Sequence, residues 1–543
     1  MGYVLPALVI NKLKKAVWHF KDIFTTNTNI KNSMRRYALI SLVIIITSLA
    51  STAQNKAVNK STVPAAKASG TVTKPAGTAV KKIGGYNIPI TLTPFKNTWV
   101  YLGCYFGKYK NLADSTWLNE KSEGVFKGKE KLPRGIYFAV SPQKYLLFEF
   151  LMDKEQHFSI KADTTNLSKV TITGSAENQM FQDYTTFLSQ KTPMLTALQK
   201  QLGDAKTARD SSLIKTTMTK ANKELQDYRE TFTKAHPTSM LASFFYAMKR
   251  PEIPVIPTGK NGKADSSYPY RYVKDNWWQG VAFDDESLVR TPFFEPKLEE
   301  YFKYYVAPEA DSVISEVNYM LLVSRENREM FKYLLGKFTD KYINPEYMGQ
   351  EKVFLFLFDK YYSKGDTAWL NSKQTKFIFD RAYSLMANQL GEQAADLVMA
   401  DTSGKPVSLY GINAPYTFVT FWDPNCGHCK ETVPRIDSIY RAKWKGLGVK
   451  IVGVNVDEGA NDTWKKFVTE HKLEGWAHMY QTKEARDAET KKGVANFRQL
   501  YDVYKTPTLY LLDSQKRIIG KMLSLEQFDD VLTAKIKTQK PQP

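Results

Sequence analysis

The pattern of apolar and polar residues changes along this chain of 543 residues, and each pattern predicts a different kind of structure. Between Tyr86 and Gly174, short runs rich in Tyr, Phe, Val and Ile alternate with Gly, Pro and Asn at the spacing of β-hairpins. The seven strands expected here are 87–93, 98–105, 124–127, 135–140, 145–150, 157–160 and 169–173. We therefore expect an all-β sandwich domain over residues 84–176.

From about Asn178 to Gln389, apolar residues recur at i, i+3 and i+4, which gives each segment one buried stripe and predicts helices. The expected helices are 180–189, 221–235, 241–249, 297–305, 325–342, 352–362 and 372–388. This pattern predicts an all-α middle domain over residues 177–390. Its aromatic pairs, Trp277-Trp278 and Phe293-Phe294, either belong to the core or line a ligand groove.

From Gly391 onward, strands and helices alternate, which predicts α/β layers over a central mixed sheet. The expected strands are 396–400, 406–409, 417–422, 450–457, 477–481, 508–512 and 517–522. The expected helices are 427–445, 462–472, 494–501 and a last one that opens at Ser524. This C-terminal domain is expected over residues 391–537, followed by a short tail at 538–543.

The N-terminal pattern is that of an exported protein. Residues 34–53 carry two arginines, an apolar run of about 14 residues and small residues up to Ala53, the features of a secretory signal peptide. Residues 1–53 are thus expected to be an upstream extension and signal, and 54–83 a flexible linker. Cleavage near Ala53 would release a periplasmic or secreted protein without an integral membrane segment; an uncleaved signal that anchors the chain is the alternative.

The formal net charge of +21 raises the question of a nucleic-acid partner. The lysines are scattered and stand beside acids, as Lys465 and Lys466 do near Glu470. Neither zinc-finger spacing nor an aromatic RNA-binding motif is present in the sequence. The charge therefore predicts a solvated basic surface and no nucleic-acid partner.

The candidate chemistry lies in two of the three cysteines, which form a Cys-Gly-His-Cys sequence from Cys426 to Cys429 behind the aromatic strand end at Trp422. Disulfide exchange needs an exposed thiolate and a second thiol that resolves the mixed disulfide. A helix that starts here puts Cys426 at its positive end and Cys429 one turn deeper. We expect Cys426 to attack, Cys429 to resolve and His428 to depress the pKa of Cys426, with the Cys426–Cys429 disulfide as the redox centre and no other cofactor.

Other uses of the cysteines are less well supported. A zinc site needs four ligands, but the nearest histidines, His471 and His478, are unpaired and are expected on the surface, so no metal is predicted. A permanent disulfide between Cys426 and Cys429 would close too short a loop to stabilise much. Cys104 lies in a predicted strand and is expected to be a buried, unpaired thiol.

The cysteine pair, Pro434 after it and Thr506-Pro507 ahead of a late strand together resemble a thioredoxin-fold domain of the TlpA/ResA type, over about residues 391–537. An extra strand and helix at 449–472 are similar to that family's insertion. The upstream regions resemble uncharacterised domains that precede such folds in secreted bacterial proteins.

This resemblance implies a cis bond before Pro507 that faces the cysteines, with Trp422, Thr506 and Pro507 in substrate binding. It also implies a secreted or periplasmic thiol-disulfide oxidoreductase. Its partners would be the thiols and disulfides of client proteins, and it would act as a reductase fed by a membrane electron donor. The Gly-His pair, also found in protein disulfide isomerases, argues for a more oxidising poise.

The sequence departs from the family at the expected proton acceptors. Thr420 stands where thioredoxins have a buried carboxylate, and Thr432 where TlpA/ResA proteins have a glutamate. Glu431, one step round the helix, is expected to face solvent.

Two other functions remain open. One is a non-catalytic binding or scaffold protein that uses its aromatic-rich upstream domains, in which case Trp277 or Phe293 would be essential. The other is a thiol peroxidase, which is the weaker hypothesis because Asp423 stands where such enzymes have the threonine of Thr-x-x-Cys.

Overall fold

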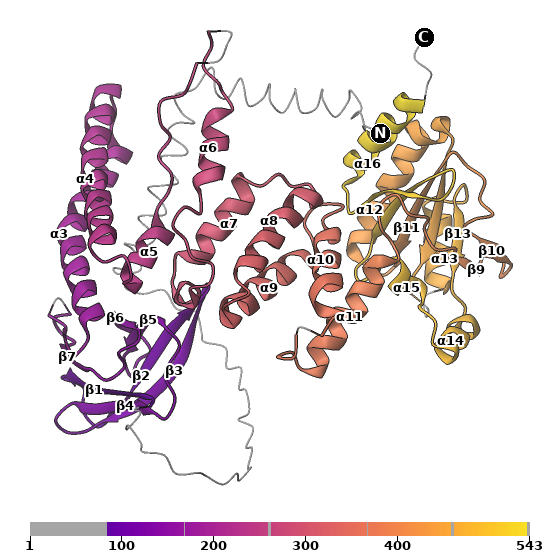
Figure 1. The fold of residues 1–543 in the computed structure, drawn as a ribbon. Helices are drawn as coiled ribbons and strands as arrows, with labels where there is room; N and C mark the ends of the chain where they lie inside the picture. Colours follow the sequence, from indigo (N-terminus) through magenta and orange to yellow (C-terminus); the bar gives the residue numbers. More distant parts are fainter. Residues whose placement is uncertain (1–83, 168, 259–261, 366, 458–460, 540–543) are drawn as a thin grey trace. The chain divides into compact units, whose positions relative to one another are not determined.

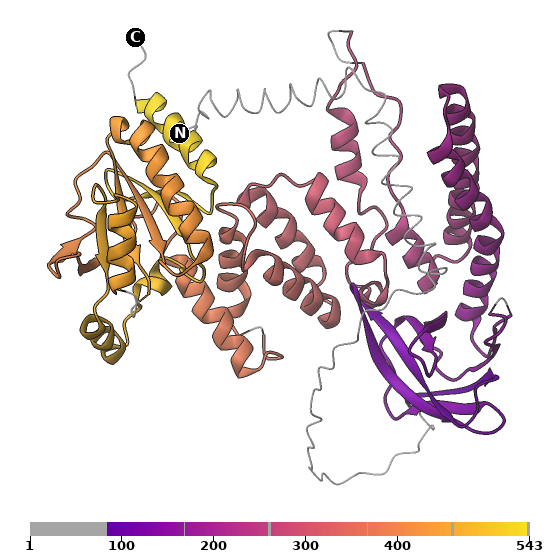
Figure 2. The ribbon, with the colours of Figure 1, turned by 180° about the vertical axis from the view of Figure 1, so that it is seen from behind.

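The computed structural model describes residues 84–539 apart from 168, 259–261, 366 and 458–460 (Figures 1 and 2). The predicted signal peptide and linker lie outside the described residues. The chain forms two compact units, of which the first ends at Tyr305 and also takes in Ser324–Met330. The second comprises Val306–Val323 and the residues from Phe331 onward. The helical region is thus divided between the units.

The first unit begins with two four-stranded sheets, which confirms the predicted β-sandwich. One sheet has the order β4 (Glu123–Gly128), β1 (Tyr86–Thr93), β7 (Ser159–Asp163), β8 (Thr171–Thr173). The other has the order β3 (Tyr109–Leu118), β2 (Thr98–Phe106), β5 (Gly135–Val140), β6 (Leu146–Met152). Alternate residues such as Ile90 and Leu102 fill the shared core. Strand β3 was not predicted, because most of its residues are exposed and its apolar residues do not alternate regularly with polar ones.

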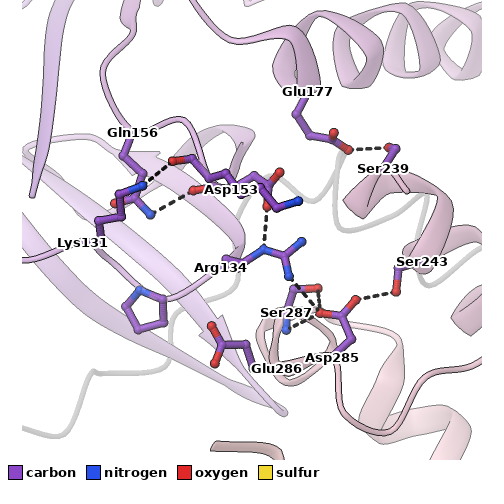
Figure 3. A network of polar contacts seen from close by, with 12 residues as sticks. Lys131, Arg134, Asp153, Gln156, Glu177, Ser239, Ser243, Asp285, Glu286 and Ser287 are labelled. Atoms are coloured by element: carbon purple, nitrogen blue, oxygen red, sulfur yellow. Dashed lines mark hydrogen bonds and ion pairs between the residues drawn. The ribbon is translucent and has the colours of Figure 1, made fainter. Parts of the chain in front are cut away.

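Helices follow the sandwich in the same unit. They are α3 (Ala176–Asp204), α4 (Ala208–Ala235), α5 (Met240–Met248), α6 (Tyr268–Asn276), η1 (Glu286–Arg290) and α7 (Phe294–Tyr304). Figure 3 shows how polar side chains connect them to the sandwich: Arg134, just before β5, pairs with Asp153 at 2.5 Å and with Asp285 at 3.6 Å. Ser243 of α5 donates to the same Asp285 at 2.6 Å. Asp285 therefore links the two parts, because it forms an ion pair with Arg134 of the sandwich and accepts a hydrogen bond from Ser243 of the helices.

The aromatic pairs of the helical region belong to the core. Trp277 is 2% exposed, Phe293 7% and Phe294 1%. The Trp278 ring lies 6.3 Å from that of Phe294, centre to centre. The burial of Trp277, Phe293 and Phe294 supports the interpretation that these residues pack in the core, and Trp278 is half-buried.

The second unit contains helices before the C-terminal domain and an α/β layer fold. The helices up to residue 390 are α8 (Ala310–Val323), α9 (Arg328–Tyr342, which begins in the first unit), α10 (Glu351–Leu357), η2 (Phe358–Tyr362) and α11 (Ser372–Met386). The later ones are α12 (Gly427–Ile439), η3 (Tyr440–Trp444), η4 (Lys445–Leu447), α13 (Asn461–Glu470), α14 (Lys483–Lys492), α15 (Phe497–Leu500) and α16 (Leu525–Gln539). No helix among the described residues is both long and apolar enough to cross a membrane.

A seven-stranded mixed sheet forms the centre of the α/β layers, as predicted. Its order is β10 (Pro406–Ser408), β9 (Val398–Ala400), β13 (Ala477–Tyr480), β12 (Val449–Asn455), β11 (Tyr416–Trp422), β14 (Thr508–Asp513), β15 (Ile518–Lys521). Strand β11 runs parallel to β12 and antiparallel to β14, and all seven of its residues are buried. One face carries Phe418 and Trp422 under α12, and the other carries Val419 and Phe421. This central strand leads directly into the cysteine pair.

A buried ion pair joins the helices before residue 390 to the sheet. Lys521, at the end of β15, lies 2.7 Å from the Glu351 carboxylate of α10, and these side chains are 3% and 1% exposed. Lys521 also donates to the backbone oxygen of Asn388 at 2.7 Å. These helices and the α/β layers therefore form one packed body.

Candidate functional site

The cysteine pair lies on a turn that its own polar residues organise. The Asp423 carboxylate accepts the backbone N–H of Asn425 at 2.7 Å, and its backbone oxygen accepts that of Cys426 at 3.1 Å. Cys426 is the N-cap of α12, with extended backbone angles (φ −75°, ψ 124°). The turn therefore presents Cys426 at the helix N-terminus, where exposed N–H groups favour negative charge. This role of Asp423 was not predicted from the sequence, although an Asp-Pro-Asn stretch is a turn signal.

Thr506, which lies 80 positions away in sequence, contacts the first thiol. The sulfur of Cys426 is 3.5 Å from the backbone oxygen of Thr506. A side-chain hydrogen bond with Thr506 is the largest cause that lowers the pKa of Cys426, and backbone hydrogen bonds with Cys429 and His428 act in the same direction. Cys426 is half-buried, so its thiolate is both favoured and accessible.

The second thiol has the opposite electrostatic environment. Cys429, in the first turn of α12, is fully buried, and burial raises its pKa to about 12. A buried thiol with a high pKa stays protonated and unreactive until its neighbour forms a mixed disulfide. The pair thus has one thiol suited to attack and one suited to resolution.

His428 is exposed on the first turn of α12. The backbone N–H of His428 helps to lower the pKa of Cys426, because at a helix start the N–H groups point toward the N-cap. The expected role of the imidazole stays a prediction.

The peptide bond between Thr506 and Pro507 is cis, as the resemblance implied. Thr506, whose backbone oxygen contacts the sulfur of Cys426, also lines an open cleft of about 510 Å³. The other lining residues are Asp423, Val456, Asp457, Arg498, Tyr504 and Lys505.

Trp422, expected to bind substrate, is fully buried and packs against Phe467, with ring centres 5.1 Å apart. It supports the site from inside, because the side chain at the end of β11 faces the core beneath α12 and not the cleft. Thr420 is also fully buried, and among the described residues its hydroxyl has no hydrogen-bond partner. Glu431 is exposed, as expected.

Of the two histidines that were expected on the surface, one is exposed and one is buried. His471 is exposed, but His478 is 7% exposed, which corrects its expected surface position. The residue lies on strand β13, which pairs with strands on both sides, so the imidazole ring is enclosed. Its Nε2 lies 2.8 Å from the backbone oxygen of Leu473. Burial lowers the pKa of His478. Over the part of the chain that the structure describes, His, Cys, Asp and Glu do not gather in groups of three that could hold a metal ion. Cys104 is a buried free thiol, as expected.

Two protein families match parts of this chain. Residues 390–521 match the AhpC/TSA family, and residues 214–377 match a domain of unknown function, DUF5106. The chain is 27% identical over 137 residues to the thiol-disulfide oxidoreductase ResA of Bacillus cereus, which covers 25% of this chain and 70% of that protein. ResA of Bacillus subtilis is 26% identical over 129 residues, covering 24% and 64%.

Solved structures give similar matches. A domain of a "possible thiol-disulfide isomerase" from Cytophaga hutchinsonii is 33% identical, with 28% of this chain and 97% of that chain covered and a TM-score of 0.24. The thioredoxin domain of a thiol-disulfide oxidoreductase from Bacteroides vulgatus is 26% identical, with 28% and 98% covered and a TM-score of 0.23. These matches cover about the same share of this chain as the C-terminal domain.

Proposed function

Because the C-terminal domain of this chain belongs to the AhpC/TSA family and its relatives include ResA thiol-disulfide oxidoreductases, we propose that the chain reduces protein disulfides through Cys426 and Cys429. One observation carries the proposal: an accessible thiol of lowered pKa stands at a helix N-terminus, and a buried thiol of raised pKa stands one turn behind it. This asymmetry is what a two-step exchange requires.

The reaction balances as a two-electron transfer from the cysteine pair to the client. The Cys426 thiolate attacks one sulfur of the client disulfide and forms a mixed disulfide, while the other client sulfur leaves as a thiolate. Cys429 then loses its proton and attacks the sulfur of Cys426. The client is released as a dithiol, and Cys426 and Cys429 remain as a disulfide, which a dithiol donor must reduce again.

Thr506, Pro507 and the cleft beside them would hold the client. Thr506 already contacts Cys426, so a peptide that lies along this segment would bring its disulfide to the attacking sulfur. We also propose that the signal sequence at 34–53 directs export of the chain to the periplasm or out of the cell. A membrane protein would then serve as the electron donor.

The test uses insulin as the disulfide substrate and dithiothreitol as the electron source. Cys426→Ser should abolish turnover, and Cys429→Ser should accumulate a mixed disulfide that non-reducing electrophoresis detects. Cys104→Ala, which removes a thiol far from this site in sequence, should keep full activity. Turnover that persists in Cys426→Ser would show that another group attacks.

The direction of electron flow is measured separately by equilibrating the full chain with glutathione buffers. A potential well below about −220 mV supports a reductase, and one near −150 mV supports an oxidant or isomerase. Consumption of hydrogen peroxide that depends on Cys426 would instead favour the peroxidase hypothesis.

A further inference from the structure

Helix α11 lies beside α15, from which the chain leads on to Thr506 (Figure 1). Both segments belong to the second unit. Ser384 donates its hydroxyl to the backbone oxygen of Gln499 at 2.6 Å. Asn388, just beyond α11, donates to the backbone oxygen of Leu500 at 3.2 Å. The last carbonyl groups of a short helix such as α15 lack partners within it, so these side chains from outside hold its end in place.

Arg381 makes the strongest of these contacts. Its guanidinium pairs with the Asp502 carboxylate; the two side chains are 7% and 17% exposed. Its Nε donates to the backbone oxygen of Ile343 at 3.1 Å, and its guanidinium carbon lies 5.1 Å from the centre of the Tyr504 ring. A charge this deeply buried is costly to leave unpaired, so the pair strongly constrains the position of Asp502.

The backbone at Asp502 needs such a constraint. Its φ of 52° lies in the left-handed region, which costs free energy for a residue other than glycine. Only three residues separate Asp502 from Thr506, and two of them, Tyr504 and Lys505, line the cleft together with Thr506. A shift at Asp502 would therefore be transmitted along a short chain to the group that contacts Cys426.

We propose that Arg381 is a positioning residue of the redox site, which acts through Asp502 and Tyr504 to hold Thr506 against Cys426 and to fix one wall of the client cleft. This proposal rests on the proposed function, because the position of Thr506 matters only if Cys426 reacts with a client. Its test is independent of that function, because the alkylation of Cys426 can be measured whether or not the chain reduces disulfides. It gives a role to the helices that precede the C-terminal domain: they form part of the redox unit, and α11 supports the substrate-facing segment.

The test measures the Cys426 thiolate directly. The full chain is reduced, and alkylation of Cys426 by iodoacetamide is followed from pH 5 to 10 by mass spectrometry. In Arg381→Met, the pH midpoint should rise by roughly half a unit and the rate at pH 7 should fall roughly threefold, since the hydrogen bond from Thr506 weakens. Arg381→Lys keeps the charge opposite Asp502 and should lie between wild type and Arg381→Met.

Two further variants separate positioning from general destabilisation. Asp502→Asn should shift the midpoint in the same direction as Arg381→Met, and combining the two should add little because both break one contact. Lys376→Met is the matched control: it removes an exposed ion pair with Asp380 on the same helix, with side chains 75% and 53% exposed, and should leave the midpoint unchanged. With insulin as substrate, Arg381→Met should raise KM more than it lowers kcat.

The outcomes are distinct. If Arg381→Lys and Asp502→Asn, which both keep a side chain of similar size, leave the alkylation midpoint and KM at wild-type values, the proposal is wrong, whether or not Arg381→Met folds. If the alkylation midpoint shifts in these variants but the wild-type chain reduces no disulfide, the positioning role of Arg381 is supported and the proposed function is wrong.

Discussion

The structure predicts that the thiols of Cys426 and Cys429 differ strongly in reactivity. An ordinary cysteine thiol has a pKa of about 8.5, so the raised pKa of Cys429, about 12, reduces its thiolate population at neutral pH by roughly 1000-fold. The pKa of Cys426 is lowered, mainly by a side-chain hydrogen bond with Thr506, which adds to the difference between the two thiolates. Nucleophilicity falls with pKa at a slope of about 0.4 to 0.5, which leaves an advantage of at least about 30-fold for Cys426.

The assay is competitive alkylation of the reduced full chain at pH 7, with the modified cysteines identified by peptide mass spectrometry. Cys426 should be alkylated at least about 30-fold faster than Cys429. The burial of Cys429 should widen that ratio further, and Cys104, also buried, provides an internal reference for a slow thiol. The rate at Cys426 should rise with pH and approach its plateau at a lower pH than the rate at an ordinary cysteine, because the pKa of Cys426 is lowered.

The single variants locate the cause of the asymmetry. In Cys426→Ser, Cys429 should remain slow, because desolvation is the largest cause of its raised pKa and the neighbouring thiol is a smaller one. Alkylation of Cys429 within about threefold of Cys426 in the intact chain would refute the assigned roles, since neither burial nor the helix terminus would then control reactivity.

Two further predictions concern stability. Lys521→Met leaves the Glu351 carboxylate buried without its partner, so it should lower the free energy of unfolding by about 3–5 kcal/mol, as measured by urea titration. The control is Lys376→Met, which removes an exposed ion pair. A loss of stability in Lys521→Met no larger than that in Lys376→Met would contradict the packing of α10 on the sheet. Trp277→Ala should cost about 3–5 kcal/mol because the side chain is buried, whereas Tyr145→Ala, 61% exposed in the same unit, should cost little. An unchanged stability in Trp277→Ala would revive the groove interpretation.

Much of the fold follows from patterns that are local in sequence. The sandwich, the helical region and the α/β layers were predictable because the period of apolar residues reflects which face of a strand or helix is buried. Elements with little apolar periodicity were missed, such as β3 and α14; no residue of α14 is buried. The domain boundaries stay predictions, although the two compact units divide the helical region near residue 306.

The sequence by itself determined the chemistry, because a Cys-x-x-Cys spacing at a strand end places two thiols on one helix turn without help from the rest of the chain. Only the tertiary structure decided their environment. It buried Trp422 and His478, and it brought Thr506 to Cys426 across 80 positions and Arg381 to Asp502 across 121. The pKa of a thiol depends on neighbours in space, and no local pattern records which distant residues those will be.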